Sequence, residues 1–215
     1  MHESLDIASR EFEGALRRGD EISARAVLGH QLGDDGVHSA VELIVMPALE
    51  RIGADWEAGD LPLADVYASG NLAEMLLAEW LPVRPPAGTG QAPVAVAVLE
   101  DHHVLGKRLV LSVLRTAGLH VADYGHGLTV DQLVERCRDQ APRVLLVSTL
   151  MLPAALRVRP LVEGLAGLEP RPAVIVGGAP FRLDPELWRE VGADAGGHTA
   201  SDAFALVERF DGGAA

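Results

Sequence analysis

The chain has 215 residues and a formal net charge of −13. Nucleic-acid backbones are bound through clustered lysine and arginine, so this balance argues against a nucleic-acid partner. No apolar run approaches the roughly 18 residues that a membrane-spanning helix needs, and residues 1–10 are too charged for the apolar core of a signal peptide. A single cysteine, Cys137, excludes an internal disulfide. Together these features predict a cytoplasmic protein without a membrane partner.

The first part of the chain, residues 1–81, is predicted to be a domain of four bundled helices. Apolar residues recur there at intervals of three and four, in segments joined by short polar turns. Gly19-Asp20 ends the first helix, and Asp20 is a suitable N-cap for the second. The third helix can be capped by Asp34 or Asp35.

Two prolines mark the second half of this bundle. Pro47 lies inside the third apolar pattern, where we expect a kink or a break because proline cannot donate the helical hydrogen bond. Gly59-Asp60 ends that helix, and Pro62 suits the first turn of the fourth.

A Pro- and Gly-rich stretch, residues 82–93, is predicted to be a linker to a second domain, residues 94–215. In that second domain apolar strand patterns alternate with helix patterns, which indicates a parallel sheet with helices on both faces. Strands are expected near 94–99, 119–123, 143–148, 173–177 and 193–195. Helices are expected near 104–117, 129–139, 153–166, 184–191 and 199–210. These units fit a flavodoxin-like (Rossmann-like) five-stranded α/β fold with strand order 2-1-3-4-5.

The most informative motif follows the first predicted strand. Asp101, His103 and Gly106 stand in the spacing D-x-H-x-x-G, between an apolar strand pattern and a helix pattern. An ordinary polar loop and a zinc site that includes His102 are alternatives for these residue types. A phosphate-binding P-loop is excluded, because Asp101 stands where that motif needs its first glycine.

Two further motifs follow later strands. Ser148 and Leu150, in the spacing S-x-L, end the third predicted strand, and Gly177-Gly178 ends the fourth. A ligand of an open α/β sheet lies beyond the carboxyl ends of its strands, on the loops after the first, third and fourth strands in this topology. The three motifs are therefore expected to form one site.

In this order and at these strand ends, the three motifs resemble the cobalamin-binding signature. Almost the whole chain resembles the corrinoid-binding modules of methionine synthase and of corrinoid methyltransferase systems, which have a helical cap followed by a Rossmann-like domain. The resemblance implies that cobalamin, as adenosyl- or methylcobalamin, binds base-off with His103 on cobalt and Asp101 orienting His103. His102 is the alternative ligand. The nucleotide tail would enter a slot lined by Gly106, Ser148, Leu150, Gly177 and Gly178.

The resemblance also assigns a role to the helical domain, as a cap over the upper face of the corrin. The segment 52–61 resembles the helix end that covers this face in the family. Candidate lining residues are Trp56, Leu63, Tyr67, Asn71 and Met75. Without the resemblance, Trp56 and Tyr67 fit equally well as core residues of the bundle.

Two functions suit such a layout. A methyl carrier would shuttle a methyl group on cobalt between partner methyltransferases, whereas a light sensor would change its packing or self-association when light breaks the upper cobalt–carbon bond. We expect the sensor, with the carrier as the alternative. Trp56 favours the sensor. The arginine-rich composition also favours it, because it suggests the GC-rich genome of an aerobic bacterium, in which the Co(I) state that a carrier needs is hard to maintain. In cobalamin light sensors of the MerR type, Glu and His occupy the positions that are Val66 and Tyr67 here. The upper histidine of those sensors is therefore missing from this chain.

The chain also resembles the photocobilins, which pair cobalamin with a bilin. A second pigment such as biliverdin could then contact His126, His198 and Tyr67. No nucleophile elbow or acid/base pair is present in the sequence, so the chain is not expected to be an enzyme by itself. A protein partner, or a second copy of the chain, is expected.

Overall fold

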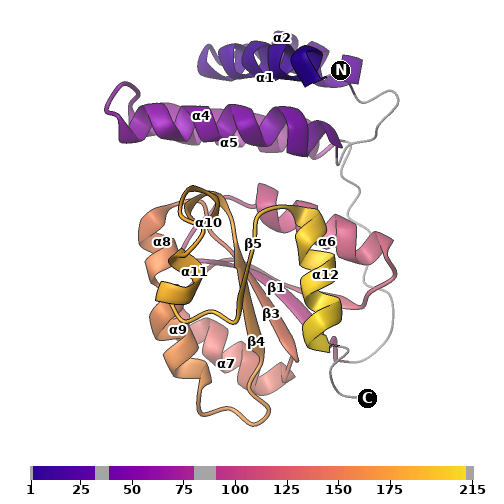
Figure 1. Cartoon of the computed structure of the whole chain (residues 1–215), viewed down its shortest axis with the longest axis vertical. Coiled ribbons are helices and arrows are strands. Elements are labelled where there is room, and N and C mark those ends of the chain that lie inside the picture. The colour runs from indigo at the N-terminus through magenta and orange to yellow at the C-terminus, as the bar shows by residue number, and fades with distance from the viewer. Residues whose placement is uncertain (1, 32–38, 80–90, 212–215) are drawn as a thin grey trace. The chain divides into compact units, whose positions relative to one another are not determined.

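The computed structural model describes residues 2–31, 39–79 and 91–211 and divides the chain into two compact units (Figure 1). Unit 1 comprises Met1–Pro82 and unit 2 comprises Val83–Ala215, and each is described by itself. The predicted caps Asp34 and Asp35, and most of the predicted linker 82–93, lie outside the described residues.

Unit 1 is a helical bundle, as predicted. Two helices, α1 (His2–Arg17) and α2 (Glu21–Gln31), form one layer, and α4 (Met46–Glu57) and α5 (Leu63–Leu77) form the other (Figure 1). Asp20 is the predicted cap of α2, and its carboxylate accepts a hydrogen bond from the Ser23 N–H at 3.1 Å. Pro62 occupies the N-cap position of α5, one residue earlier than predicted.

The break expected near Pro47 is a π-helical turn, η1 (Val41–Val45), which runs directly into α4. Pro47 stands in the first turn of α4 and has no N–H to donate to the carbonyl of Leu43, and its ring crowds that carbonyl. The wider π turn just before Pro47 relieves the crowding without ending the helix.

The buried stripe of α1 is narrower than the sequence pattern indicated. Ala8, Phe12 and Leu16 are buried at helical spacing, whereas Ile7 lies beside this stripe and is exposed. Ile22, in the first turn of α2, is 82% exposed although it is apolar.

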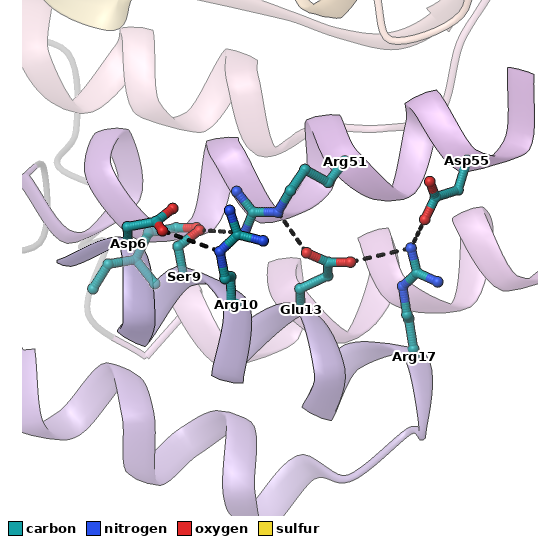
Figure 2. Close-up of polar contacts among 8 residues, drawn as sticks. Asp6, Ser9, Arg10, Glu13, Arg17, Arg51 and Asp55 are labelled. Atoms are coloured by element: carbon teal, nitrogen blue, oxygen red, sulfur yellow. Dashed lines mark hydrogen bonds and ion pairs between the residues drawn. The ribbon is translucent and has the colours of Figure 1, made fainter. Parts of the chain in front are cut away.

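Polar contacts fasten α1 to α4 and to the π turn (Figure 2). The buried Ser9 hydroxyl donates to the Ile44 carbonyl at 2.9 Å and accepts from the Arg51 guanidinium at 2.7 Å. Arg51 Nε also donates to Glu13 Oε2 at 2.5 Å, and the other oxygen of Glu13 lies 3.1 Å from Arg17. Glu13 is therefore held between two guanidinium groups at the interface of the two helices.

Unit 2 is a five-stranded parallel sheet in the predicted order β2-β1-β3-β4-β5 (Figure 1). The strands are β1 (Val94–Leu99), β2 (Val121–Leu128), β3 (Val144–Ser148), β4 (Ala173–Gly177) and β5 (Ala195–Gly197). The helices are α6 (Leu105–Thr116), α7 (Val130–Gln140), α8 (Leu152–Leu156), α9 (Val158–Leu165), α10 (Ala179–Leu183), α11 (Leu187–Glu190) and α12 (Ala200–Asp211).

Helices cover both faces of this sheet because every central strand is apolar on both sides. Val94 and Val96 of β1 pack toward α6 and α12, and Ala95, Ala97 and Leu99 pack toward α7 and α9. Cys137 of α7 belongs to the core on the α7 and α9 side of the sheet. Burial raises the pKa of its thiol to about 12, so it is a neutral core residue.

Three elements of unit 2 differ from the sequence pattern. The helix expected over 153–166 is interrupted at Arg157 and forms α8 and α9, and the one expected over 184–191 is replaced by α10 and α11. β2 continues to Leu128, past its expected end, through Gly125 and Gly127. Because of this extension, β2 reaches the loop after β1.

We predict that Ser9→Ala lowers the free energy of unfolding of unit 1 by about 1 kcal/mol, because it removes the donor to the Ile44 carbonyl and an acceptor of Arg51. Denaturant unfolding followed by circular dichroism measures this change. Ser4→Ala, at an exposed position of the same helix, is the control. Equal unfolding midpoints for the two variants would contradict the role given to Ser9.

Candidate functional site

The loop between β1 and α6 carries a buried carboxylate–imidazole pair. Asp101 and His103 are 4% and 8% exposed, and His103 Nδ1 lies 2.7 Å from Asp101 Oδ1. The same oxygen accepts the backbone N–H groups of His102 at 2.7 Å and of His103 at 3.1 Å. The loop therefore wraps around one carboxylate oxygen.

The second oxygen of Asp101 joins this loop to the loop after β3. Asp101 Oδ2 accepts the backbone N–H groups of Leu150 at 2.8 Å and of Met151 at 3.2 Å. Burial by itself would raise the pKa of Asp101, but the hydrogen bonds from the His103 ring and from the Leu150 and His103 backbone outweigh it. The pKa of Asp101 consequently lies well below its usual range, and the group is a carboxylate.

This pair fixes the chemistry of the imidazole. Because Asp101 is an acceptor, His103 Nδ1 carries the proton that it donates, and the lone pair of the neutral ring lies on Nε2. A carboxylate hydrogen-bonded to one ring nitrogen also fixes the orientation of the imidazole. His103 thus has the orientation and tautomer of a metal-ligating histidine bound through Nε2.

The glycine and serine positions predicted for the site lie at neighbouring strand ends. A Cβ on Gly106 would stand 2.9 Å from Ser148 Oγ, so this glycine lets the start of α6 lie close to the end of β3. Gly178 has φ +119°, and a Cβ there would stand 1.8 Å from the Thr149 carbonyl oxygen. Gly177 ends β4 and pairs with Ser148 across the sheet.

The loops after β1, β3 and β4 therefore meet at one edge of the sheet, as the sequence predicted. The absent side chains of Gly106 and Gly178 allow the closest approaches between them, which is a structural reason for these glycines beside the predicted contact with a nucleotide tail. Leu150 is half-buried and contributes its backbone N–H to Asp101.

Two buried residues of this region, Thr149 and Lys107, were not predicted from the sequence. Thr149 is 2% exposed, and its hydroxyl has no hydrogen-bond partner within the described ranges. Lys107 follows Gly106 and is buried, with its ammonium 2.7 Å from Asp123 of β2. This ion pair fixes the first turn of α6 against β2. The position of Lys107 directly after the motif was the one signal for it.

His102, the alternative ligand, lies in a different environment from His103. Its side chain is exposed and packs beside Gly127, where a Cβ would stand 2.7 Å from His102 Cε1, and its ring makes an edge contact with His126. Across residues 2–31, 39–79 and 91–211, no three His, Cys, Asp or Glu side chains are grouped as a metal site would need. The zinc alternative thus gains no support.

The five cap residues predicted for the upper face belong to unit 1. Tyr67 and Met75 are 40% and 46% exposed, and Asn71 between them is exposed on the same side of α5. The alternative that Tyr67 is a core residue of the bundle is therefore not supported. Trp56, near the end of α4, is half-buried, and α5 begins at Leu63, whose side chain lies outside the described part.

The residues suggested for a second pigment are not gathered. His126 lies in β2 and His198 follows β5, and these strands form opposite edges of the sheet. Four strand spacings, roughly 19 Å in all, separate the two edges. One pigment contacting both histidines has no support in this arrangement.

Comparison with known families identifies the ligand class. A sequence model described as a B12 binding domain matches residues 92–208, which is more than half of the chain. The chain belongs to the B12-binding domain family. A second model of the same description matches residues 8–79, so the helical unit also belongs to a recognised B12-binding module.

Two relatives show which branch of corrinoid proteins is similar. The trimethylamine corrinoid protein of Methanosarcina barkeri is 30% identical over 167 residues, which cover 74% of this chain and 76% of that protein. Dimethylamine corrinoid protein 2 of Methanosarcina mazei is 30% identical over 169 residues, covering 75% and 77%. The chain is thus a corrinoid protein homologous to methylamine corrinoid proteins, and the prediction of a cobalamin cofactor is confirmed.

Solved structures share the fold. The monomethylamine corrinoid protein of Methanosarcina barkeri superposes with a TM-score of 0.72 at 20% identity, covering 95% of this chain and 98% of that chain. A chain of the methanol:cobalamin methyltransferase complex of the same species has a TM-score of 0.51 at 17% identity, covering 99% and 83%. Both support the layout of a helical region and a parallel α/β sheet.

No helix within residues 2–31, 39–79 and 91–211 is long and apolar enough to cross a membrane.

The low pKa of Asp101 predicts a pH dependence of stability. An unfolded aspartate titrates near 3.9, so the stability that Asp101 contributes is complete above that value and is lost as the pH falls toward the lower, folded pKa. We expect the unfolding midpoint of the cobalamin-free protein to fall more steeply between about pH 4 and pH 2 than that of Asp101→Asn. Thermal melts at several pH values measure the slopes, with Asp60→Asn as an exposed control. Parallel curves for wild type and Asp101→Asn would contradict the assignment.

We also predict that Gly178→Ala destabilises unit 2 by roughly 2–4 kcal/mol, because an added Cβ meets the Thr149 carbonyl and the backbone has a positive φ. Gly167→Ala is the matched control, since nothing lies within 4 Å of its Cβ position. Denaturant midpoints compare the two variants. If both variants unfold together with wild type, the close approach at Gly178 is not a constraint.

Proposed function

We propose that the chain is a methyl carrier, which holds a corrinoid with His103 below the cobalt and presents it to partner methyltransferases. The buried Asp101–His103 pair is the observation that carries the ligand assignment, because it leaves the lone pair of Nε2 as the donor. The relatives are methylamine corrinoid proteins, which supports the alternative of methyl carriage over the expected light sensing.

The residues of the loop suit a histidine whose bond to the metal forms and breaks during a methyl-transfer cycle. When bound, the corrinoid supplies a cobalt atom that accepts and releases a methyl group. Asp101 holds the His103 ring through Nδ1 whether or not Nε2 is ligated, so the imidazole stays in place through such a cycle.

The predicted tail slot, lined by Gly106, Ser148, Leu150, Gly177 and Gly178, remains part of the proposal. These residues share one edge of the sheet with His103. Ser148 supplies a hydroxyl that can donate or accept, and Leu150 supplies a half-buried apolar side chain. A ligand with a polar phosphate–ribose part and an aromatic base needs both kinds of group.

In unit 1, the proposal assigns the exposed side of α5 to the upper face of the corrin. Tyr67, Asn71 and Met75 recur every four residues and are accompanied by the exposed Ala64 and Ala68. Small and apolar side chains in such a row leave a surface on which a flat, largely apolar ring can lie. Trp56 and Leu63 complete the predicted lining.

The proposed partner is a methyltransferase that acts on a methylated amine. The relatives are trimethylamine and dimethylamine corrinoid proteins, and one chain of similar fold comes from a methanol:cobalamin methyltransferase complex. A bilin is not included in the proposal, because His126 and His198 lie at opposite edges of the sheet.

We predict that His103→Ala abolishes the base-off, histidine-on absorption spectrum of the cobalamin-loaded protein and weakens binding by roughly tenfold or more. His102→Ala should keep both, since His102 is exposed and makes no contact with the Asp101 side chain beyond its backbone N–H. An unchanged spectrum in His103→Ala would refute the ligand assignment.

Methyl carriage and light sensing are separated by a second experiment. With a methylamine methyltransferase and a reductant present, we expect methyl transfer from trimethylamine or dimethylamine to the bound corrinoid, and gel filtration profiles that are the same in the dark and after illumination. No transfer from either amine, together with a light-dependent change in size, would favour the sensor.

A further inference from the structure

Glu100, the residue directly before Asp101, has a backbone conformation that disfavours it. Within residues 2–31, 39–79 and 91–211, only Glu100 and Ala141 combine a side chain with a positive φ, and both have φ +45°. Ala141 is the C-cap of α7, where left-handed residues are common. Glu100 has no such setting, because it links the end of β1 to the loop that carries His103. A left-handed side-chain residue here lies above the energy of ordinary backbone and must be held by its surroundings.

Two contacts hold Glu100 in this conformation. Arg157 Nε lies 3.1 Å from Oε1 and 3.0 Å from Oε2 of Glu100, so one guanidinium group contacts both carboxylate oxygens. The Glu100 N–H donates to the Leu128 carbonyl at 2.9 Å. Arg157 stands at the break between α8 and α9. The end of β1, the end of β2 and the α8–α9 junction therefore converge on Glu100.

The conformation of Glu100 determines where Asp101 points. The Asp101 carbonyl accepts the Gly127 N–H at 2.8 Å, and its carboxylate reaches Leu150 and Met151 on the other side. A rotation of Glu100 to ordinary backbone angles would turn the next peptide unit and break these contacts. His103, which is oriented by Asp101, would then lose its fixed position.

We propose that Glu100, paired with Arg157, is a positioning residue for the His103 ligand; this inference rests on the proposed corrinoid function. The ion pair offsets the strain of the left-handed turn and so keeps most molecules in the conformation that presents His103 Nε2. Both side chains are partly exposed, at 29% and 48%, so the pair contributes modestly. A modest contribution matters here because it acts against a strain of similar size.

The test compares three variants: Arg157→Gln removes the ion pair alone, Glu100→Ala removes the pair and keeps the strain, and Glu100→Gly removes both. Each protein, with only its histidines labelled with ¹⁵N, is titrated with hydroxocobalamin, and the bound cobalt is reduced to Co(II) with a one-electron reductant. The histidine-on fraction is then read from the ¹⁵N doublet in the electron paramagnetic resonance (EPR) spectrum. We expect Arg157→Gln and Glu100→Ala to lower the affinity by about two- to fivefold and to lower the histidine-on fraction. Glu100→Gly should lie closer to wild type than Glu100→Ala.

Two matched controls separate positioning from stability. Arg171 contacts both carboxylate oxygens of Asp194, at 3.2 and 2.9 Å. The two residues lie just before β4 and β5, so they lie at the amino-terminal end of the sheet, opposite the strand ends that carry the site. Arg171→Gln thus removes a similar ion pair away from the site. Ala141→Gly removes the same positive-φ strain at the end of α7. Both should leave the affinity and the histidine-on fraction unchanged, even where the melting temperature shifts.

The inference is overturned if Arg157→Gln and Glu100→Ala keep the affinity and histidine-on fraction of wild type, even with lower melting temperatures. It is also overturned if Arg171→Gln lowers the histidine-on fraction as much as Arg157→Gln. Equal behaviour of Glu100→Gly and Glu100→Ala would refute the part assigned to strain. A wild-type protein with no histidine-on signal would instead refute the proposed function, so the two failures are distinguishable.

Discussion

The site depends on the buried carboxylate of Asp101. This group accepts five N–H donors, three on Oδ1 from the loop after β1 and two on Oδ2 from the loop after β3. A buried charge with so many donors is stabilised rather than neutralised, which is why its pKa is low in spite of burial. One side chain therefore joins two strand ends and sets the tautomer of the imidazole. The orientation of the His103 ring is therefore set by the same Asp101 contacts that join the loops after β1 and β3.

The surrounding backbone is arranged to allow these contacts. The extension of β2 to Leu128 flanks the loop on one side, and the approach of Gly178 to Thr149 brings the end of β4 against the loop after β3 on the other. Lys107 and Asp123 fix the start of α6. Glu100, between β1 and Asp101, has an unfavourable positive φ. Loops that carry binding residues are usually mobile. Here the contacts of the loop after β1 limit the positions open to His103.

Much of this could be predicted from the sequence because the signals are local. Apolar strand runs alternating with helix patterns gave the order of the sheet, and the spacing of Asp101 and His103 after β1 gave the pair. The second half of β2 could not be predicted in this way, because Gly125 and Gly127, with φ +97° and +66°, are typical of a turn. Contacts such as Met151 to Asp101 and Arg157 to Glu100 join residues 50 and 57 positions apart. No spacing rule indicates them. In unit 1, the pattern could not separate core residues from the exposed side of α5, because Tyr67 and Met75 are apolar and stand at helical spacing in either case.

EPR of the Co(II) form, bound to protein in which only histidine is labelled with ¹⁵N, shows whether the imidazole of His103 is the lower ligand of the cobalt. If it is, each cobalt line splits into a doublet from a ¹⁵N nucleus, the doublet persists in His102→Ala, and it is absent in His103→Ala. A triplet from ¹⁴N in the labelled wild-type protein would show that the unlabelled base of the cofactor remains on cobalt and that His103 is not the ligand.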